Sequence, residues 1–207
     1  MFRNLLFLLT LIIILSFTNI ILSEEINDLE VYSDFILFST WERANLKGLD
    51  NKTTYVIYQD TYLRDFESLT TSFNIKENRD EHITLFEYLK GQFPGEDEEL
   101  LKSFALNNKE STKIPNNFLS EENVKVITEE EFISIFSKGW WPDFYSVYPD
   151  AQGILRFSRV GFNKSGTRAL LYIRNQWQGR AGLGGFVILV HNGSKWLVEE
   201  KVAVILS

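Results

Sequence analysis

The sequence predicts an α+β fold in which N-terminal helices pack on a C-terminal four-stranded antiparallel β-meander. Apolar residues recur at helical spacing mainly in the first two thirds of the 207 residues, and strand-like runs separated by tight turns fill the last third. Aromatic residues make up 14% of the chain, which is enough to fill a sizeable core. Because the helices precede the strands, we expect them to cover one face of the sheet.

The first 23 residues have the pattern of a secretory signal peptide. Arg3 precedes an apolar run over 5–15, polar residues follow, and Ser23 is small enough to end a cleaved signal. An uncleaved membrane anchor is the alternative, because the apolar stretch approaches the roughly 20 residues of a membrane span. We expect residues 1–23 to direct export and residues 24–207 to form one α+β domain, periplasmic or secreted.

Composition excludes several classes of site and partner. The chain has no cysteine, so it forms no disulfide and no thiolate metal site. Its two histidines, His82 and His191, lie far apart in the sequence, and we expect neither a metal nor a cofactor. A formal net charge of −7 argues against nucleic acid or anionic membranes as the main partner.

Helical spacing and end signals predict four helices. Gly48 is expected to end the first, and Thr128 with Glu131 forms a capping box at the start of the last, which Gly139 should stop. The expected ranges are 28–47, 83–90, 96–107 and 129–138.

Runs of β-branched and aromatic residues predict the strands. Two short strands are expected at 53–58 and 124–127. Asn192-Gly193 indicates a two-residue type I′ turn, which needs positive φ at both positions. The four strands of the meander are expected at 154–162, 167–177, 185–191 and 195–206.

The glycine-rich stretch RAGLGGF, residues 180–186, does not predict a phosphate site. Its spacing matches neither nucleotide-binding glycine motif, and it joins two antiparallel strands instead of leading into a helix. We expect a flexible connection with a bulge at the start of the following strand, where neighbouring backbone approaches closely.

No assembled catalytic set is visible. The chain lacks a G-x-S-x-G nucleophile elbow, and Ser158 falls where a strand residue is expected. Glu199 and Glu200 are adjacent on a strand and should point to opposite faces. A catalytic pair of carboxylates elsewhere in the chain remains an alternative, because the distance between two carboxylates depends on the fold.

A patch of cationic and aromatic groups is the candidate binding site. Trp140 and Trp141 enter the sheet region from the last helix, while alternation along one strand places Arg156 and Ser158 on one face, near Arg174 of the next strand. Such a patch would suit an anionic or carbohydrate ligand. In the alternative, both tryptophans are buried and the arginines are solvated.

The last 75 or so residues carry a set of short motifs: S-x-V-G-F-N at 158–163, A-L-x-Y at 169–172, a glycine-rich loop, and Trp196 with Val198 in a G-x-W-x-V pattern. With these motifs the chain resembles a family of secreted bacterial proteins without an assigned function. The resemblance implies an envelope protein and no reaction. Relatives often have cysteine in the glycine loop, and this chain has none, so a cysteine-dependent role is excluded.

These observations together favour an exported bacterial protein that acts as a non-enzymatic binding or interaction domain for a protein, peptide or glycan. The alternative is a carboxylate-dependent hydrolase acting on cell-envelope or glycan material.

We predict that the protein is recovered outside the cytoplasm with residues up to about Ser23 removed. N-terminal sequencing of the native protein measures this. A soluble cytoplasmic protein that begins at Met1 would contradict export, and a membrane-bound one that begins there would identify an anchor.

Overall fold

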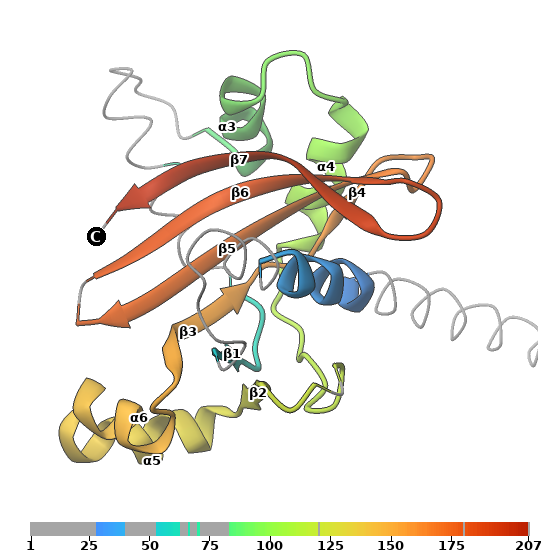
Figure 1. Cartoon of the computed structure of the whole chain (residues 1–207). Coiled ribbons are helices and arrows are strands. Elements are labelled where there is room, and N and C mark those ends of the chain that lie inside the picture. Colours follow the sequence, from blue (N-terminus) through green and yellow to red (C-terminus); the bar gives the residue numbers. More distant parts are fainter. Residues whose placement is uncertain are drawn as a thin grey trace, which may run out of the picture.

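The computed structural model describes residues 28–39, 53–62, 66, 70, 83–119, 121–179 and 181–206. The predicted signal peptide and the second half of the first predicted helix therefore lie outside the described residues. A helix over residues 28–39 comes first (Figure 1). The elements that follow are β1 (Thr54–Tyr58), α3 (Leu85–Gln92), α4 (Glu98–Asn107), β2 (Val124–Ile127), α5 (Glu129–Gly139), α6 (Trp141–Val147), β3 (Ala151–Phe157), β4 (Gly161–Phe162), β5 (Arg168–Gln178), β6 (Ala181–His191) and β7 (Trp196–Leu206).

The described strands form one seven-stranded mixed sheet in the order β2-β1-β3-β5-β6-β7, with β4 paired to β5. This arrangement confirms the α+β class. The expected four-stranded meander is only part of it, because β1 lies parallel to both β2 and β3 and extends the sheet beyond the antiparallel strands. Parallel neighbours need long connections through helices, which leave no turn signal in the sequence.

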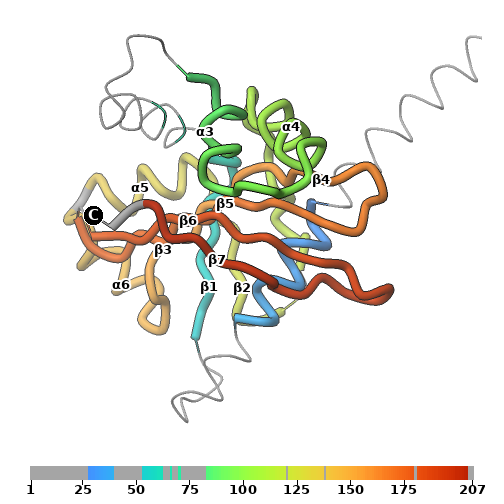
Figure 2. Tube along the Cα trace, turned by 90° about the horizontal axis from the view of Figure 1, so that it is seen from above, coloured from blue at the N-terminus to red at the C-terminus, as the bar shows by residue number. Residues whose placement is uncertain are grey.

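Helices cover both faces of the sheet, so the expectation of one covered face was wrong (Figure 2). On the first face, the 28–39 helix packs over side chains of β1, β3, β5 and β6. On the second face, α3 and α4 cover β5 and β6, while α5 and α6 cover β1 and β3. Successive side chains of a strand point to opposite faces, and several strands here are buried on both.

Polar contacts fix the 28–39 helix to the sheet. The Tyr32 hydroxyl donates to the carbonyl of Ser158 at 2.7 Å, and its ring stacks on Phe157 with centroids 4.8 Å apart. Asp28 forms a largely buried ion pair with Arg159, with an Oδ2 to Nε distance of 3.2 Å. Burial raises the pKa of Tyr32, with the charge of Asp28 adding to the effect, so the phenol stays a hydrogen-bond donor.

The expected strand over 154–162 is interrupted between β3 and β4. Ser158 Oγ accepts the backbone N–H of Tyr172 at 2.9 Å and replaces part of the strand pairing there. Beyond the break, Gly161 meets α4 so closely that a Cβ would lie 2.5 Å from the backbone nitrogen of Phe104. Asn163 Oδ1 accepts two backbone N–H groups in the turn that follows. Ser158, Gly161 and Asn163 of the S-x-V-G-F-N motif therefore have structural roles.

The β6–β7 hairpin is present, but its turn lies one residue later than predicted. The Asn192 N–H donates to the carbonyl of Lys195, which leaves Gly193 and Ser194 at the tip. Gly193 has a φ of 97°, whereas Asn192 is not among the residues with positive φ. The type I′ prediction was wrong because Asn192 Oδ1 instead accepts the N–H groups of Ser194 and Lys195.

The capping box of α5 is confirmed, since the Thr128 hydroxyl accepts the Glu131 N–H and the Glu131 carboxylate accepts the Thr128 N–H. Gly139 does not stop the helix by adopting positive φ. It is the last helical residue, and Trp140 takes the φ of 66°. A Cβ on Gly139 would lie 2.7 Å from a carboxylate oxygen of Asp143, so close approach explains this glycine.

The glycines of 180–186 are strand residues. β5 ends at Gln178 and β6 begins at Ala181, so the expected long connection between the two strands is wrong. The expected irregularity near the start of β6 is confirmed, because the register of β6 against β7 shifts between Gly184 and Gly185. The register of β5 against β6 also shifts, between Gln176 and Gln178. Close backbone approach is confirmed, because a Cβ on Gly185 would lie 2.6 Å from the carbonyl oxygen of Val202.

We predict that Gly161→Ala lowers the free energy of unfolding by about 2 kcal/mol, because the added methyl overlaps the α4 backbone. Gly166→Ala is the comparison, since Gly166 has a φ of 67° but open space around it, and should cost only about 1 kcal/mol. Urea unfolding measures both. If Gly161→Ala lowered the free energy of unfolding by no more than Gly166→Ala, the close contact between Gly161 and α4 would be contradicted.

We predict that Arg159→Ala destabilises the protein by about 3 kcal/mol, because Asp28 is left as a buried, unpaired charge. Adding Asp28→Asn to that variant removes the uncompensated charge and should recover part of the loss. Thermal and urea unfolding of both variants provide the measurement. If Asp28→Asn lowered stability further in the Arg159→Ala background, the ion pair would not be the cause.

Candidate functional site

Two arginines face each other across the β3–β5 ladder on the second face of the sheet. Arg156 and Arg174 are direct partners in the antiparallel register, flanked by the pair Phe157 and Ile173 that points to the first face. Both arginines are half-buried. Arg156 and Arg174 are therefore neighbours, as predicted, because β3 pairs with β5 in this register.

Aromatic rings surround the two guanidinium groups. The Arg156 guanidinium lies 3.8 Å from the ring centre of Tyr58, 5.5 Å from that of Tyr62 and 5.4 Å from that of Phe132. Arg174 Nη1 donates to the Tyr62 hydroxyl at 3.3 Å. The negative faces of the rings attract the cations and hold them in place. We call these five residues the arginine–aromatic cluster.

The cluster lies between the two helical units of the second face. Tyr58 belongs to the apolar group beneath α5 and α6, whereas Tyr62 packs against the group beneath α3 and α4. Arg156 contacts both rings, so it spans the boundary between the two groups.

The cluster places two guanidinium groups next to each other. Like charges directly opposite each other on neighbouring strands repel, and the contacts of Arg156 and Arg174 with the aromatic groups offset part of this repulsion. Each guanidinium is a planar fork of N–H donors that matches a carboxylate, sulfate or phosphate.

Arg159 and Arg168 form ion pairs with carboxylates. Arg159 is held by Asp28. Arg168 binds Glu96 at 2.6 Å and Glu199 at 2.7 Å, and the hydrogen bonds to these carboxylates raise its pKa further above its usual range. Arg180 lies outside the described residues.

The remaining members of the predicted patch lie elsewhere. Ser158 is fully buried, its hydroxyl accepting the Tyr172 N–H and donating to the carbonyl of Arg159, so it does not contribute to a surface. Trp141 is buried in the core beneath α5 and α6. Trp140 has 67% of its surface exposed at the junction of these two helices. The structure therefore brings together Arg156 and Arg174 but not the other three.

The aromatic segment after α5 forms a small core against β1 and β3, so the alternative in which both tryptophans are buried is confirmed for Trp141 and wrong for Trp140. Its buried members are Trp141 and Phe144, and the partly buried rings of Tyr145 and Tyr148 pack against them. The ring of Phe136 links this core to Phe132 of the cluster, with centroids 4.5 Å apart. Burial raises the pKa of Tyr145 and Tyr148, and for Tyr148 the charge of Glu131 adds to the effect.

Sequence reasoning missed the three aromatic members of the cluster. Tyr58 could have been placed by strand alternation, since it shares a face with Val56, but its contact with Arg156 depends on the pairing of β1 with β3. Phe132 could have been placed on the inner side of the capped helix. Tyr62 lies after the end of β1, and no local sequence pattern indicates its contact with the arginines.

Acidic groups do not form a comparable site where the chain is described. The pKa of Glu98 is lowered by its hydrogen bond to Lys90, and that of Glu130 is lowered by a hydrogen bond to its own backbone. Both carboxylates are exposed at helix N-termini, and a lowered pKa is unsuited to a general acid at neutral pH. Within the described ranges, no group of three His, Asp or Glu side chains could hold a metal ion.

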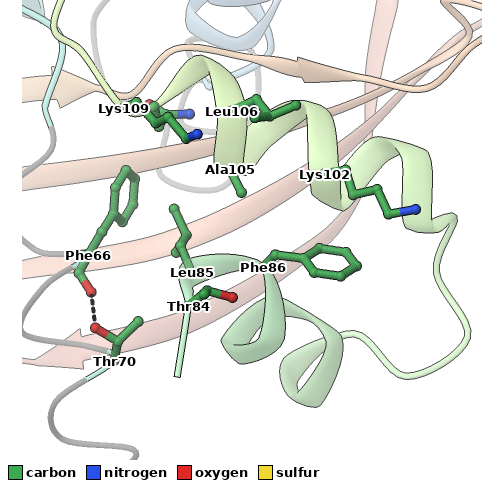
Figure 3. A pocket seen from close by; sticks show the side chains of 10 residues that line it. Phe66, Thr70, Thr84, Leu85, Phe86, Lys102, Ala105, Leu106 and Lys109 are labelled. Carbon is green, nitrogen blue, oxygen red and sulfur yellow. Dashed lines mark hydrogen bonds between the residues drawn. The ribbon is translucent and has the colours of Figure 1, made fainter. Parts of the chain in front are cut away.

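A cavity of about 510 Å³ lies between α3 and α4 (Figure 3). Its wall is mainly apolar, and none of the described residues lining it is acidic. Asn108, which also lines it, already binds the backbone of Phe104 and Arg159, and Lys102 is paired with Glu99 at 3.3 Å. The apolar contributors are Phe66, Leu85, Phe86, Ala105 and Leu106.

No family model, no curated protein and no solved structure matches this chain. Among the helices that the structure describes, none is long and apolar enough to cross a membrane.

Proposed function

We propose that this chain is an exported binding domain that recognises an anionic group on a glycan, peptide or protein through the arginine–aromatic cluster. The observation that carries the proposal is the direct pairing of Arg156 with Arg174 against aromatic rings. Two guanidinium groups in one place can engage one anion from two sides.

The aromatic rings add to this chemistry. Tyr58, Tyr62 and Phe132 supply apolar contact area, and the Tyr62 hydroxyl gives a polar end beside Arg174. A ligand that joins an acidic group to a flat or apolar part, such as an acidic sugar or an acidic side chain in a peptide, would use both properties. The overall charge of −7 makes a local cationic site the natural place for such a ligand.

Export is supported by the hydrophobic N-terminal segment and by the resemblance of the C-terminal motifs to secreted bacterial proteins. Binding is favoured over hydrolysis because arginine keeps its proton and does not serve as general acid or base. The cluster itself contributes no carboxylate. Hydrolysis of a glycan is the alternative function, and the experiment below also detects it.

We predict that the protein binds at least one member of a panel of anionic ligands, and that Arg156→Gln with Arg174→Gln weakens this binding at least about tenfold, through loss of charge-assisted hydrogen bonds. The panel contains polyglutamate, a polyuronate, a sulfated polysaccharide and a neutral glucan. Calorimetric titration at two salt concentrations provides the affinities, and analysis of reducing ends after incubation detects cleavage.

The control is the double variant Lys164→Gln with Lys195→Gln. It removes two positive charges, as the arginine double variant does, but from two exposed turns. It should bind as the wild type does. Equal weakening in both double variants would show non-specific attraction and contradict the proposed site. Absence of binding to every anionic ligand would contradict the function, and release of reducing ends would favour the hydrolase.

A further inference from the structure

An apolar groove of about 340 Å³ lies on the first face of the sheet, opposite the arginine–aromatic cluster. It runs between the end of the 28–39 helix and the ends of β5, β6 and β7. One wall is formed by Phe35 and Ile36 of the helix, and the floor by Leu155, Ile173 and neighbouring strand residues. Cavities that bind small molecules commonly have this size and are mainly apolar, with few polar groups.

The glycine-rich segment helps to shape the groove. Gly184 and Gly185 of β6 line it with backbone alone, and they lie between larger side chains at Leu183 and Phe186. Leu183 and Trp177, which also line the groove, keep 42% and 38% of their surfaces exposed. Large apolar side chains exposed at a concave surface indicate a site that another apolar group covers.

One charged residue, Lys201, is found among the described residues that line the groove. Its ammonium group lies 5.0 Å from the ring centre of Phe38 and 6.0 Å from that of Phe35, both on the 28–39 helix. These contacts hold the cation beside the groove. An apolar channel with a single cation beside it is complementary to an apolar chain that ends in one anionic group.

We infer that this groove binds a single-chain amphiphile with an acidic headgroup, the acyl chain lying along the groove and the headgroup meeting Lys201. The acyl chain removes apolar surface of Trp177 and Leu183 from water. The headgroup forms an ion pair that is partly shielded by the neighbouring rings. In a protein of net charge −7, this local cation sets the orientation of the ligand.

The inference is independent of the proposed function. Ile173 and Asn175, which line the groove, flank Arg174 in β5, and strand alternation directs Arg174 to the other face. Loss of anion binding at the cluster would therefore leave the groove intact, and the reverse also holds.

The test uses 9,10-dibromostearate, whose bromine atoms quench tryptophan fluorescence at short range. We expect saturable quenching of the purified exported protein, reduced by at least half in Trp177→Phe. Ala203→Phe places a larger side chain in the groove at an exposed position and should weaken binding at least about tenfold while the melting temperature is kept.

The methyl ester of the same fatty acid tests the headgroup. Wild-type protein should prefer the acid about fivefold to tenfold, and Lys201→Gln should abolish this preference, whereas Lys125→Gln, which changes an exposed lysine of β2, should not. Quenching that is unchanged by both Trp177→Phe and Ala203→Phe would overturn the site. Equal binding of acid and ester by the wild type would overturn the role of Lys201, and quenching only by brominated vesicles would identify membrane adsorption instead.

Discussion

The pairing of β3 with β5 is the constraint on which the rest of the fold depends. β3 is parallel to β1 on one side and antiparallel to β5 on the other, so it joins the helix-connected strands to the hairpin strands. Its alternation also assigns the two faces. Leu155 and Phe157 enter the core beneath the 28–39 helix, while Arg156 between them turns to the opposite face and meets Arg174.

The break after β3 anchors the first helix. The Ser158 N–H still donates to the carbonyl of Tyr172, but the N–H of Tyr172 donates to the Ser158 hydroxyl, which leaves the Ser158 carbonyl to accept the Tyr32 hydroxyl. Asp28 binds Arg159 next to it, and Asp34 accepts the backbone N–H of Trp196 at 2.7 Å. Buried polar groups are stable only when they are paired, so these contacts fix the position of the helix on the sheet. The helix in turn provides one wall of the groove.

The two faces of the sheet thus present different chemistry at nearby positions. Arg174 contributes donors to the second face, and its neighbours Ile173 and Asn175 line the groove on the first. Gly184 stands opposite Arg174 in β6 and adds no side chain to either surface. A one-residue slip in the β3–β5 register would move charged groups into the core, which is why this pairing is strongly specified.

The sequence alone determined the elements whose signals are local. The helix start at Thr128, the strand runs and the β6–β7 hairpin follow from side chains within a few residues of one another, because capping and alternation act over short stretches of chain. Only the tertiary structure decided the parallel pairing of β1, the burial of Ser158 and Trp141, and the contact of Arg156 with Tyr58. These depend on contacts between residues far apart in the chain, whose free energy is gained only when the whole sheet and its helices pack together.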